Sequence, residues 1–496
     1  MSRILILPDT QNISFQGVES RGADMKIRSI SFNENLNVLL VYLYNDITSN
    51  DYIEGIKLDD EEHHDYELFP NDGLRPKEEG LLLIRLDNPF HIGSYHKLEI
   101  SCRHEKINVN VRALKPVFPI GIYGGNTVLS SRDHIMNVLS WGLDTLVANP
   151  DKLDIAKQYG FKIIANVPKK GNEIDEDVLH KYRGHEALLA WYIVDEPDIW
   201  EVEGRIPKGS TERWTNTVKN LDPETPTYIV LCRPTIFEQF AHVPDIVAVD
   251  PYPVSHLPLE YVDFMVSMIK RIRDPYPIWV IPQAFRYGRP NEQGWWGWNR
   301  YPRPDEERLM VYSAIAHGAK GVIYFTYNSF VDIARDPVQG LAALHPDALN
   351  LQLEISRIST ELHTLAPLIS ISDVLPYSPE HYVYTNRGCI QCFQILSGRE
   401  NLVLIITNRN YLYTRRDFRS FPIKDVEICI KPPRWLKPQL SFLISHEGMT
   451  TLKMYHEDEL VRIKLDELKV AMAIVLSESE EILHKLEEIW RKWRRN

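Results

Sequence analysis

Eight short apolar runs alternate with helix-like segments across the middle of the chain, and this alternation constrains the fold more than any other feature. Most runs are continuously apolar, which is typical of parallel strands covered by helices. Segments between them, such as SRDHIMNVLSWG, place apolar residues at helical spacing. Eight such strands over roughly 250 residues predict a (β/α)8 barrel. A doubly wound sheet is the alternative, but no G-x-G-x-x-G follows the first run. The runs are 118–125, 143–150, 161–168, 188–197, 225–232, 245–254, 277–285 and 320–329.

The patterning divides the chain into four parts. Residues 1–114 and 370–478 contain short β-rich runs separated by turn-forming residues, which predict a β-sandwich on each side of a barrel at 115–369. The overall prediction is an α/β fold with a central TIM barrel and two flanking β-sandwich domains. The last segment, 479–496, has the spacing of an amphipathic helix, which would pack on the protein's own surface or form an oligomer contact. Its apolar face comprises Ile482, Leu483, Leu486, Ile489, Trp490 and Trp493.

Composition limits the classes of partner. The net charge of -12 argues against nucleic acid or an anionic membrane as the main partner. No apolar run approaches the roughly 20 residues of a membrane span, and the N-terminus lacks the apolar core of a signal peptide, so a cytoplasmic location is expected. No cluster of His, Asp or Cys at metal-ligand spacing appears, so we expect neither a metal nor another cofactor.

Polar and aromatic residues follow the apolar strand bodies, and barrel enzymes place their chemistry at these C-terminal strand ends. The fourth run, WYIVDEPD, ends abruptly in two adjacent acids, Asp195 and Glu196. An acid among apolar and aromatic neighbours keeps its proton near neutral pH and can act as a general acid. The structural alternative is that Asp195 caps the following loop and Glu196 pairs with an arginine. The other strand-end candidates are Tyr123, Asn149, Asn166, Asp250, Tyr252, Gln283 and Tyr327.

A tryptophan-rich loop follows the seventh strand. The stretch NEQGWWGWNRYPRP places Trp295, Trp296 and Trp298 among glycines, where they are hard to explain as barrel core. Flat rings stack on the apolar faces of sugars, so we expect at least one to line a substrate cleft. The alternative is that one or two of them anchor the loop. Arg286 is a further candidate at the rim.

Three stretches resemble clan A-like glycoside hydrolases. HEALLAWYIVDEPD is similar to their fourth-strand motif, DIVAVDPYPV to their sixth strand, and PDEERLMVYSAIAHGAKGVIYFTYNS to their seventh helix and eighth strand. The resemblance implies an enzyme that cleaves carbohydrates. One departure matters: the clan pattern has Asn-Glu on strand four and a nucleophilic Glu on strand seven. Here strand four carries Asp195-Glu196, and Gln283 lies where the nucleophile would be, although an amide cannot form the glycosyl ester.

The adjacent Asp-Glu pair resembles that of substrate-assisted β-N-acetylhexosaminidases, as in glycoside hydrolase family 123. That resemblance implies Glu196 as acid/base and Asp195 as the group that orients a 2-acetamido substituent, whose oxygen replaces an enzyme nucleophile. Gln283, Tyr252 and Tyr327 would then bind hydroxyls or the acetamido carbonyl. The second hypothesis is a β-galactosidase-like enzyme, retaining or inverting, with Asp250 or Glu292 as nucleophile or base. The third is a carbohydrate-binding protein without catalysis.

Overall fold

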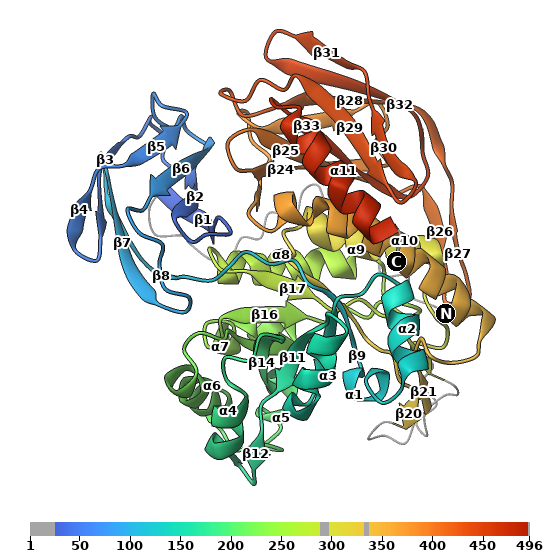
Figure 1. Cartoon of the computed structure of the whole chain (residues 1–496). Coiled ribbons are helices and arrows are strands. Elements are labelled where there is room, and N and C mark those ends of the chain that lie inside the picture. The colour runs from blue at the N-terminus through green and yellow to red at the C-terminus, as the bar shows by residue number, and fades with distance from the viewer. Residues whose placement is uncertain (1–24, 288–296, 332–336, 495–496) are drawn as a thin grey trace.

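The middle of the chain forms a closed eight-stranded barrel in the computed structural model, which describes residues 25–287, 297–331 and 337–494. In Figure 1 the barrel lies below the two β-rich parts. All eight strands are parallel, and the last, β19, pairs with the first, β9. The predicted (β/α)8 fold is therefore confirmed. In order around the barrel the strands are β9 (Ile120–Tyr123), β10 (Thr145–Ala148), β11 (Lys162–Asn166), β14 (Leu188–Val194), β15 (Thr227–Leu231), β16 (Ile246–Val249), β17 (Ile278–Val280) and β19 (Val322–Tyr324).

The barrel strands are almost wholly buried because side chains fill the interior and helices cover the outside. The interior is aromatic at its centre, where the Tyr228 and Trp279 rings lie 5.3 Å apart. Outside, almost every residue of α9 is buried, because this helix lies between the barrel and the C-terminal sheet. The covering helices are α2 (Arg132–Ser140), α3 (Leu153–Gln158), α4 (Glu176–Tyr182), α6 (Ser210–Leu221), α7 (Phe237–Phe240), α8 (Tyr261–Arg273), α9 (Pro304–Ala316) and α10 (Pro346–Ile369).

The N-terminal part consists of two four-stranded antiparallel sheets that share one apolar core. One of them also contacts the C-terminal part, where the Tyr42 hydroxyl donates to the carbonyl of Ile371 at 2.6 Å. In sheet order the strands are β1 (Met25–Phe32), β2 (Val38–Asn45), β6 (Glu79–Arg85) and β5 (Tyr66–Phe69) in the first sheet, and β4 (Glu61–His63), β3 (Ile53–Leu58), β7 (Tyr95–Cys102) and β8 (Lys106–Arg112) in the second.

The C-terminal part pairs a six-stranded sheet with a four-stranded one. Together these two β-rich parts flank the barrel, as the sequence predicted. The six strands are β22 (Asp373–Val374), β24 (Ile390–Ser397), β25 (Asn401–Asn408), β33 (Ala471–Ser477), β29 (Leu440–Ser445) and β30 (Gly448–Thr451). The four are β23 (Tyr382–Thr385), β28 (Ile423–Lys431), β32 (Leu460–Leu468) and β31 (Met454–Glu457).

The terminal helix α11 (Glu481–Arg494) packs against α10 and the edge of the six-stranded sheet (Figure 1). The Trp493 ring stacks on His363 with 3.3 Å between centroids, and Trp490 Nε1 donates to the carbonyl of Ser445 at 3.1 Å. Its apolar face therefore contacts the same chain, and an oligomer contact stays a prediction. None of the helices in the described ranges combines the length and apolar content needed to cross a bilayer.

Candidate active site

The site begins where β14 gives way to the acidic turn 195–198. Glu196 adopts a left-handed conformation with φ 38° and ψ 56°, which is uncommon for a residue other than glycine. Pro197 then opens the short helix α5 (Pro197–Trp200). The next acid, Asp198, is fully buried and accepts hydrogen bonds from the backbone amides of Cys232 at 2.9 Å and Arg233 at 2.6 Å. Asp198 thus fixes the strained turn to the end of β15.

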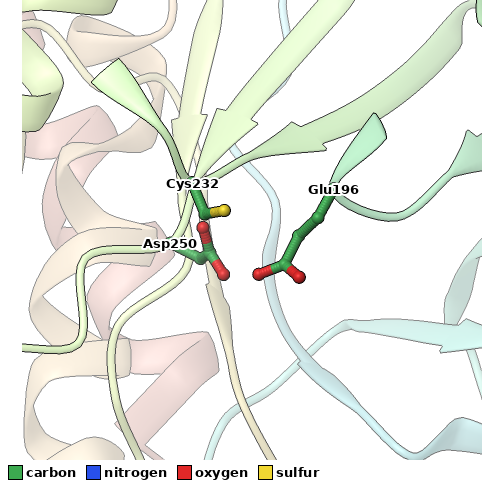
Figure 2. A group of neighbouring side chains, drawn as sticks. All are labelled: Glu196, Cys232 and Asp250. Atoms are coloured by element: carbon green, nitrogen blue, oxygen red, sulfur yellow. The ribbon is translucent and has the colours of Figure 1, made fainter. Parts of the chain in front are cut away.

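The Glu196 side chain lies close to a thiol and a second carboxyl group at neighbouring strand ends (Figure 2). Cys232 follows β15 and Asp250 follows β16, and one ligand atom from each of the three side chains lies within 4.8 Å of the others. Asp250 is only 7% exposed, and its Oδ1 atom has no hydrogen-bond partner among the described residues. Glu196 is half-buried. The same three groups could hold a metal ion, a grouping that sequence spacing does not reveal.

Burial and mutual proximity make both carboxyl groups weak acids. Burial, and next the charge of Asp195, raise the pKa of Glu196 to about 7. Burial and the proximity of Glu196 raise the pKa of Asp250 well above its usual range. No arginine is among the main groups that shift the pKa of Glu196. This differs from the alternative in which Glu196 pairs with an arginine. Two carboxyl groups coupled in this way titrate as a unit and share one proton near neutral pH.

Asp195 faces a separate recess on the other side of the turn. The recess has a volume of about 250 Å³, and its lining includes Tyr192 and Lys169. The Tyr192 hydroxyl donates to Asp195 Oδ1 at 2.5 Å, and the Tyr123 hydroxyl lies 3.4 Å from that of Tyr192. Asp195 is accessible from the recess, yet the protein around it raises its pKa, against the effect of the Tyr192 hydrogen bond. The two adjacent acids therefore lie in different environments.

An aromatic group borders the site at the ends of β16 and β17. Trp298 Nε1 donates to the carbonyl of Tyr252 at 2.7 Å, and the Tyr252 ring lies 5.9 Å from that of Phe325. Arg286 lies on β18 (Arg286–Tyr287), with its Nη1 atom 3.5 Å from His345 Nε2. Both Tyr252 and Trp298 are partly exposed, as a sugar-stacking surface requires. Trp295, Trp296 and Glu292 lie outside the described residues.

Three other strand-end candidates lie elsewhere. Gln283 is fully buried, and its amide nitrogen donates to the carbonyl of Val254 at 2.6 Å. Tyr327 is 1% exposed and packs against Trp141. Asn149 is exposed and accepts a hydrogen bond from Asn166 Nδ2 at 3.0 Å. Gln283 and Tyr327 are thus buried in this structure, and their binding roles stay predictions.

Sequence reasoning missed Cys232 and Asp198. Cys232 closes the run TPTYIVLC, so its place at the end of the fifth strand was a readable signal. Asp198 carried no signal, because its partners are backbone amides 34 and 35 residues away.

Comparison with known proteins gives partial matches. A glycoside hydrolase 42 family model, described as β-galactosidase, matches residues 210–345, a range that contains Cys232 and Asp250 but not Glu196. β-Galactosidase BgaP of Planococcus sp. (strain L4) is 30% identical over 81 residues, which cover 16% of this chain and 11% of the relative. β-Galactosidase BgaA of Planococcus sp. (strain 'SOS Orange') is 26% identical over 124 residues, or 25% of this chain and 17% of the relative. The chain thus spans less than a fifth of the length of these curated relatives.

Solved structures match more of the chain at low identity. A β-galactosidase from the psychrophilic Marinomonas ef1 is 11% identical, with a TM-score of 0.38, over 50% of this chain and 60% of that one. A β-glucuronidase from Bacteroides uniformis is 10% identical, with a TM-score of 0.35, over 90% of this chain and 60% of that one.

Proposed function

We propose that this chain is a retaining β-glycoside hydrolase in which Glu196 and Asp250 are the catalytic pair. The observation that carries the proposal is the approach of their two carboxyl groups within 4.8 Å at adjacent strand ends of the barrel. Retaining glycosidases hold their carboxyl groups about 5–5.5 Å apart, whereas inverting enzymes need about 6.5–9.5 Å to admit a water. The short separation therefore favours direct attack by one of the two acids.

The pKa values of both acids are raised, so accessibility assigns the roles within the pair. Glu196 is the more accessible acid, and with a pKa of about 7 it retains a proton near neutral pH to give to the departing glycosidic oxygen. Asp250, ionised once that proton rests on Glu196, attacks the anomeric carbon and forms a glycosyl ester. Glu196 then takes a proton from water, the resulting hydroxide attacks the same carbon, and the ester bond to Asp250 breaks. The second displacement restores the starting configuration.

The partial matches support a β-galactoside as the substrate class. The family range 210–345 contains the proposed nucleophile, and both curated relatives are named β-galactosidases. Partly exposed Tyr252 and Trp298 would stack on the sugar ring.

A 2-acetamido sugar is the second candidate, and one observation favours it. Asp195 and Tyr192 form a hydrogen-bonded pair at the recess on the other side of the acidic turn from Glu196. Such a pair would hold and polarise an acetamido group, whose oxygen would then replace Asp250 as the nucleophile.

A panel of nitrophenyl β-glycosides separates the two mechanisms. The proposal expects turnover of the β-galactoside, retention of anomeric configuration by proton NMR, and a loss of at least about 100-fold in Glu196→Gln and Asp250→Asn. Turnover confined to 2-acetamido sugars, lost in Asp195→Asn but kept in Asp250→Asn, would support the second candidate instead. Glu212→Gln, at an exposed position on α6, is the matched control. Binding of sugars without turnover of any of them would overturn both mechanisms.

A further inference from the structure

A second cavity lies at the opposite end of the barrel from Glu196. It has a volume of about 310 Å³. One side of it is formed by β1 and β8 of the N-terminal sandwich, and the other by the N-terminal ends of β16 and β17. Helices α6 and α8 also contribute to its wall. The proposed catalysis uses none of these residues.

Three cations lie in this wall, and two of them contact its one nearby carboxylate, that of Asp245. Arg112 pairs with Asp245, and Lys219 Nζ lies 3.2 Å from the other carboxylate oxygen of the same residue. Arg273 is 2% exposed and makes no ion pair among the described residues. Its guanidinium donates only to backbone carbonyls, including those of Ala241 at 2.7 Å and Asp245 at 2.6 Å, and its Nε atom has no partner. This side of the cavity therefore carries an excess of positive charge.

The cations on the other side of the cavity are compensated. Lys270 pairs with Asp274 and lies 2.9 Å from Asp373 Oδ1. Lys320 also lines the cavity, but burial lowers its pKa to about 7, so it is only partly charged near neutral pH, and its Nζ atom donates to the carbonyls of Ile369 and Ser372. The excess is thus confined to the side around Asp245.

Burial lowers the pKa of both Arg273 and Lys219. Through burial the pKa of Arg273 falls to about 10 despite the nearby Asp245. For the pKa of Lys219, the charges of Arg112 and Arg273 add to the effect of burial. An uncompensated charge away from water is costly, and a bound anion would remove the cost.

The rest of the wall determines what kind of anion fits. It is largely apolar, and the exposed Lys115 lies with it at the cavity. An inorganic ion would leave this surface unused, whereas a molecule with an apolar body would cover it. The apolar lining includes Ile30, Phe32, Val111, Leu114, Val117 and Trp279.

We propose that this cavity binds a small amphipathic oxyanion, a molecule with one carboxylate or phosphate group on an apolar body. The oxyanion lies against Lys219, beside the buried charge of Arg273, and the body lies against Trp279 and the aliphatic side chains of β8 and the following linker.

Isothermal titration calorimetry on the full chain tests this with four probes: benzoate, phenyl phosphate, inorganic phosphate and benzyl alcohol. At least one of the two aromatic anions should bind at least about tenfold more tightly than both inorganic phosphate and benzyl alcohol, since charge-assisted contacts and apolar burial act together. Binding by benzoate alone indicates a carboxylate ligand, and binding by phenyl phosphate alone indicates an organic phosphate. Failure of both aromatic anions to bind at about 10 mM, or equal binding of inorganic phosphate, overturns the proposal.

Charge-removing variants locate the binding. Lys219→Gln should weaken the preferred anion about tenfold or more, and Lys115→Gln, at an exposed position that folding does not need, should weaken it in the same direction. Lys424→Gln removes the same charge from an exposed position on β28 and should leave binding unchanged. Glu196→Gln should also leave it unchanged, which separates this cavity from the catalytic site. Equal affinity in both cavity variants and the Lys424→Gln control would place the anion elsewhere and refute the assignment.

Discussion

Replacing Asp195 with Asn tests whether a neighbouring charge helps Glu196 keep its proton. Burial first and Asp195 second raise the pKa of Glu196 from 4.5 to about 7, which adds about 3 kcal/mol to the cost of ionisation. One pKa unit corresponds to about 1.4 kcal/mol, which is less than half of this total, as suits the smaller of the two causes. Asp195→Asn should therefore lower the pKa of Glu196 by about one unit. The value should stay above 4.5, because burial remains.

The assay is a carbon-13 NMR titration of the glutamate carboxyl groups, with the Glu196 signal assigned from its loss in Glu196→Gln. On a turned-over nitrophenyl glycoside, the basic limb of kcat/KM should move to lower pH by the same amount, because the protonated acid disappears earlier. Asp466→Asn, at an exposed position on β32, is the control and should leave both readouts unchanged. An unchanged or higher pKa in Asp195→Asn would refute the reasoning, since it would mean that the charge of Asp195 does not reach Glu196.

Three further substitutions test the support of the site and of the barrel. Asp198→Ala leaves two partly buried amides without an acceptor, so we expect a loss of about 2 kcal/mol in stability and at least about tenfold in turnover, read from thermal unfolding and nitrophenyl release. Burial opposes the charge of Glu361, but Arg308 and other donors hold its pKa at about 2. Its folded pKa lies below the usual 4.5, so this stabilisation is complete above about pH 4.5 and is lost as the pH falls towards 2. Glu361→Gln should therefore lower the melting temperature near neutral pH, and the difference from the parent should shrink in acid. In Gly121→Ala the new Cβ would lie 2.4 Å from the carbonyl of Thr145, so the β9–β10 contact should lose roughly 1–3 kcal/mol, measured by denaturant unfolding.

The barrel was predictable because its signal is local and repeated. Each of the eight strands lies within one of the predicted runs, and the strand cores are as apolar as parallel strands covered on both faces must be. The antiparallel sheets on either side were predictable in kind from turn residues and short β-rich runs. Their pairing order was not, since β33 near the end of the chain inserts between β25 and β29. Such long-range pairing depends on the packing of the whole sheet rather than on any local pattern.

The candidate site was predictable in location but not in geometry. Strand-end positions correctly indicated the mouth of the barrel, because the carboxyl ends of parallel strands meet there. They did not indicate where each side chain points: Asp250 approaches Glu196, whereas Gln283 is fully buried with its amide bonded to the backbone. Direction depends on the local backbone at each strand end, which sequence spacing does not specify. The same limitation applies to Cys232, whose meeting with the two acids requires the adjacency of β14, β15 and β16.

The two adjacent acids can face different surroundings because the backbone turns between them. On a regular strand, consecutive side chains face opposite sides, and Asp195, just after β14, bonds back to Tyr192. The left-handed conformation of Glu196 then carries its carboxyl group towards Asp250 (Figure 2). That conformation costs roughly 1–2 kcal/mol in a residue with a Cβ, and the hydrogen bonds of Asp198 to the end of β15 offset part of the cost. Glycine would relieve the strain but could supply no proton. Backbone strain and a desolvated acid thus coincide at Glu196, and this coincidence is expected where a fold gives up stability for function.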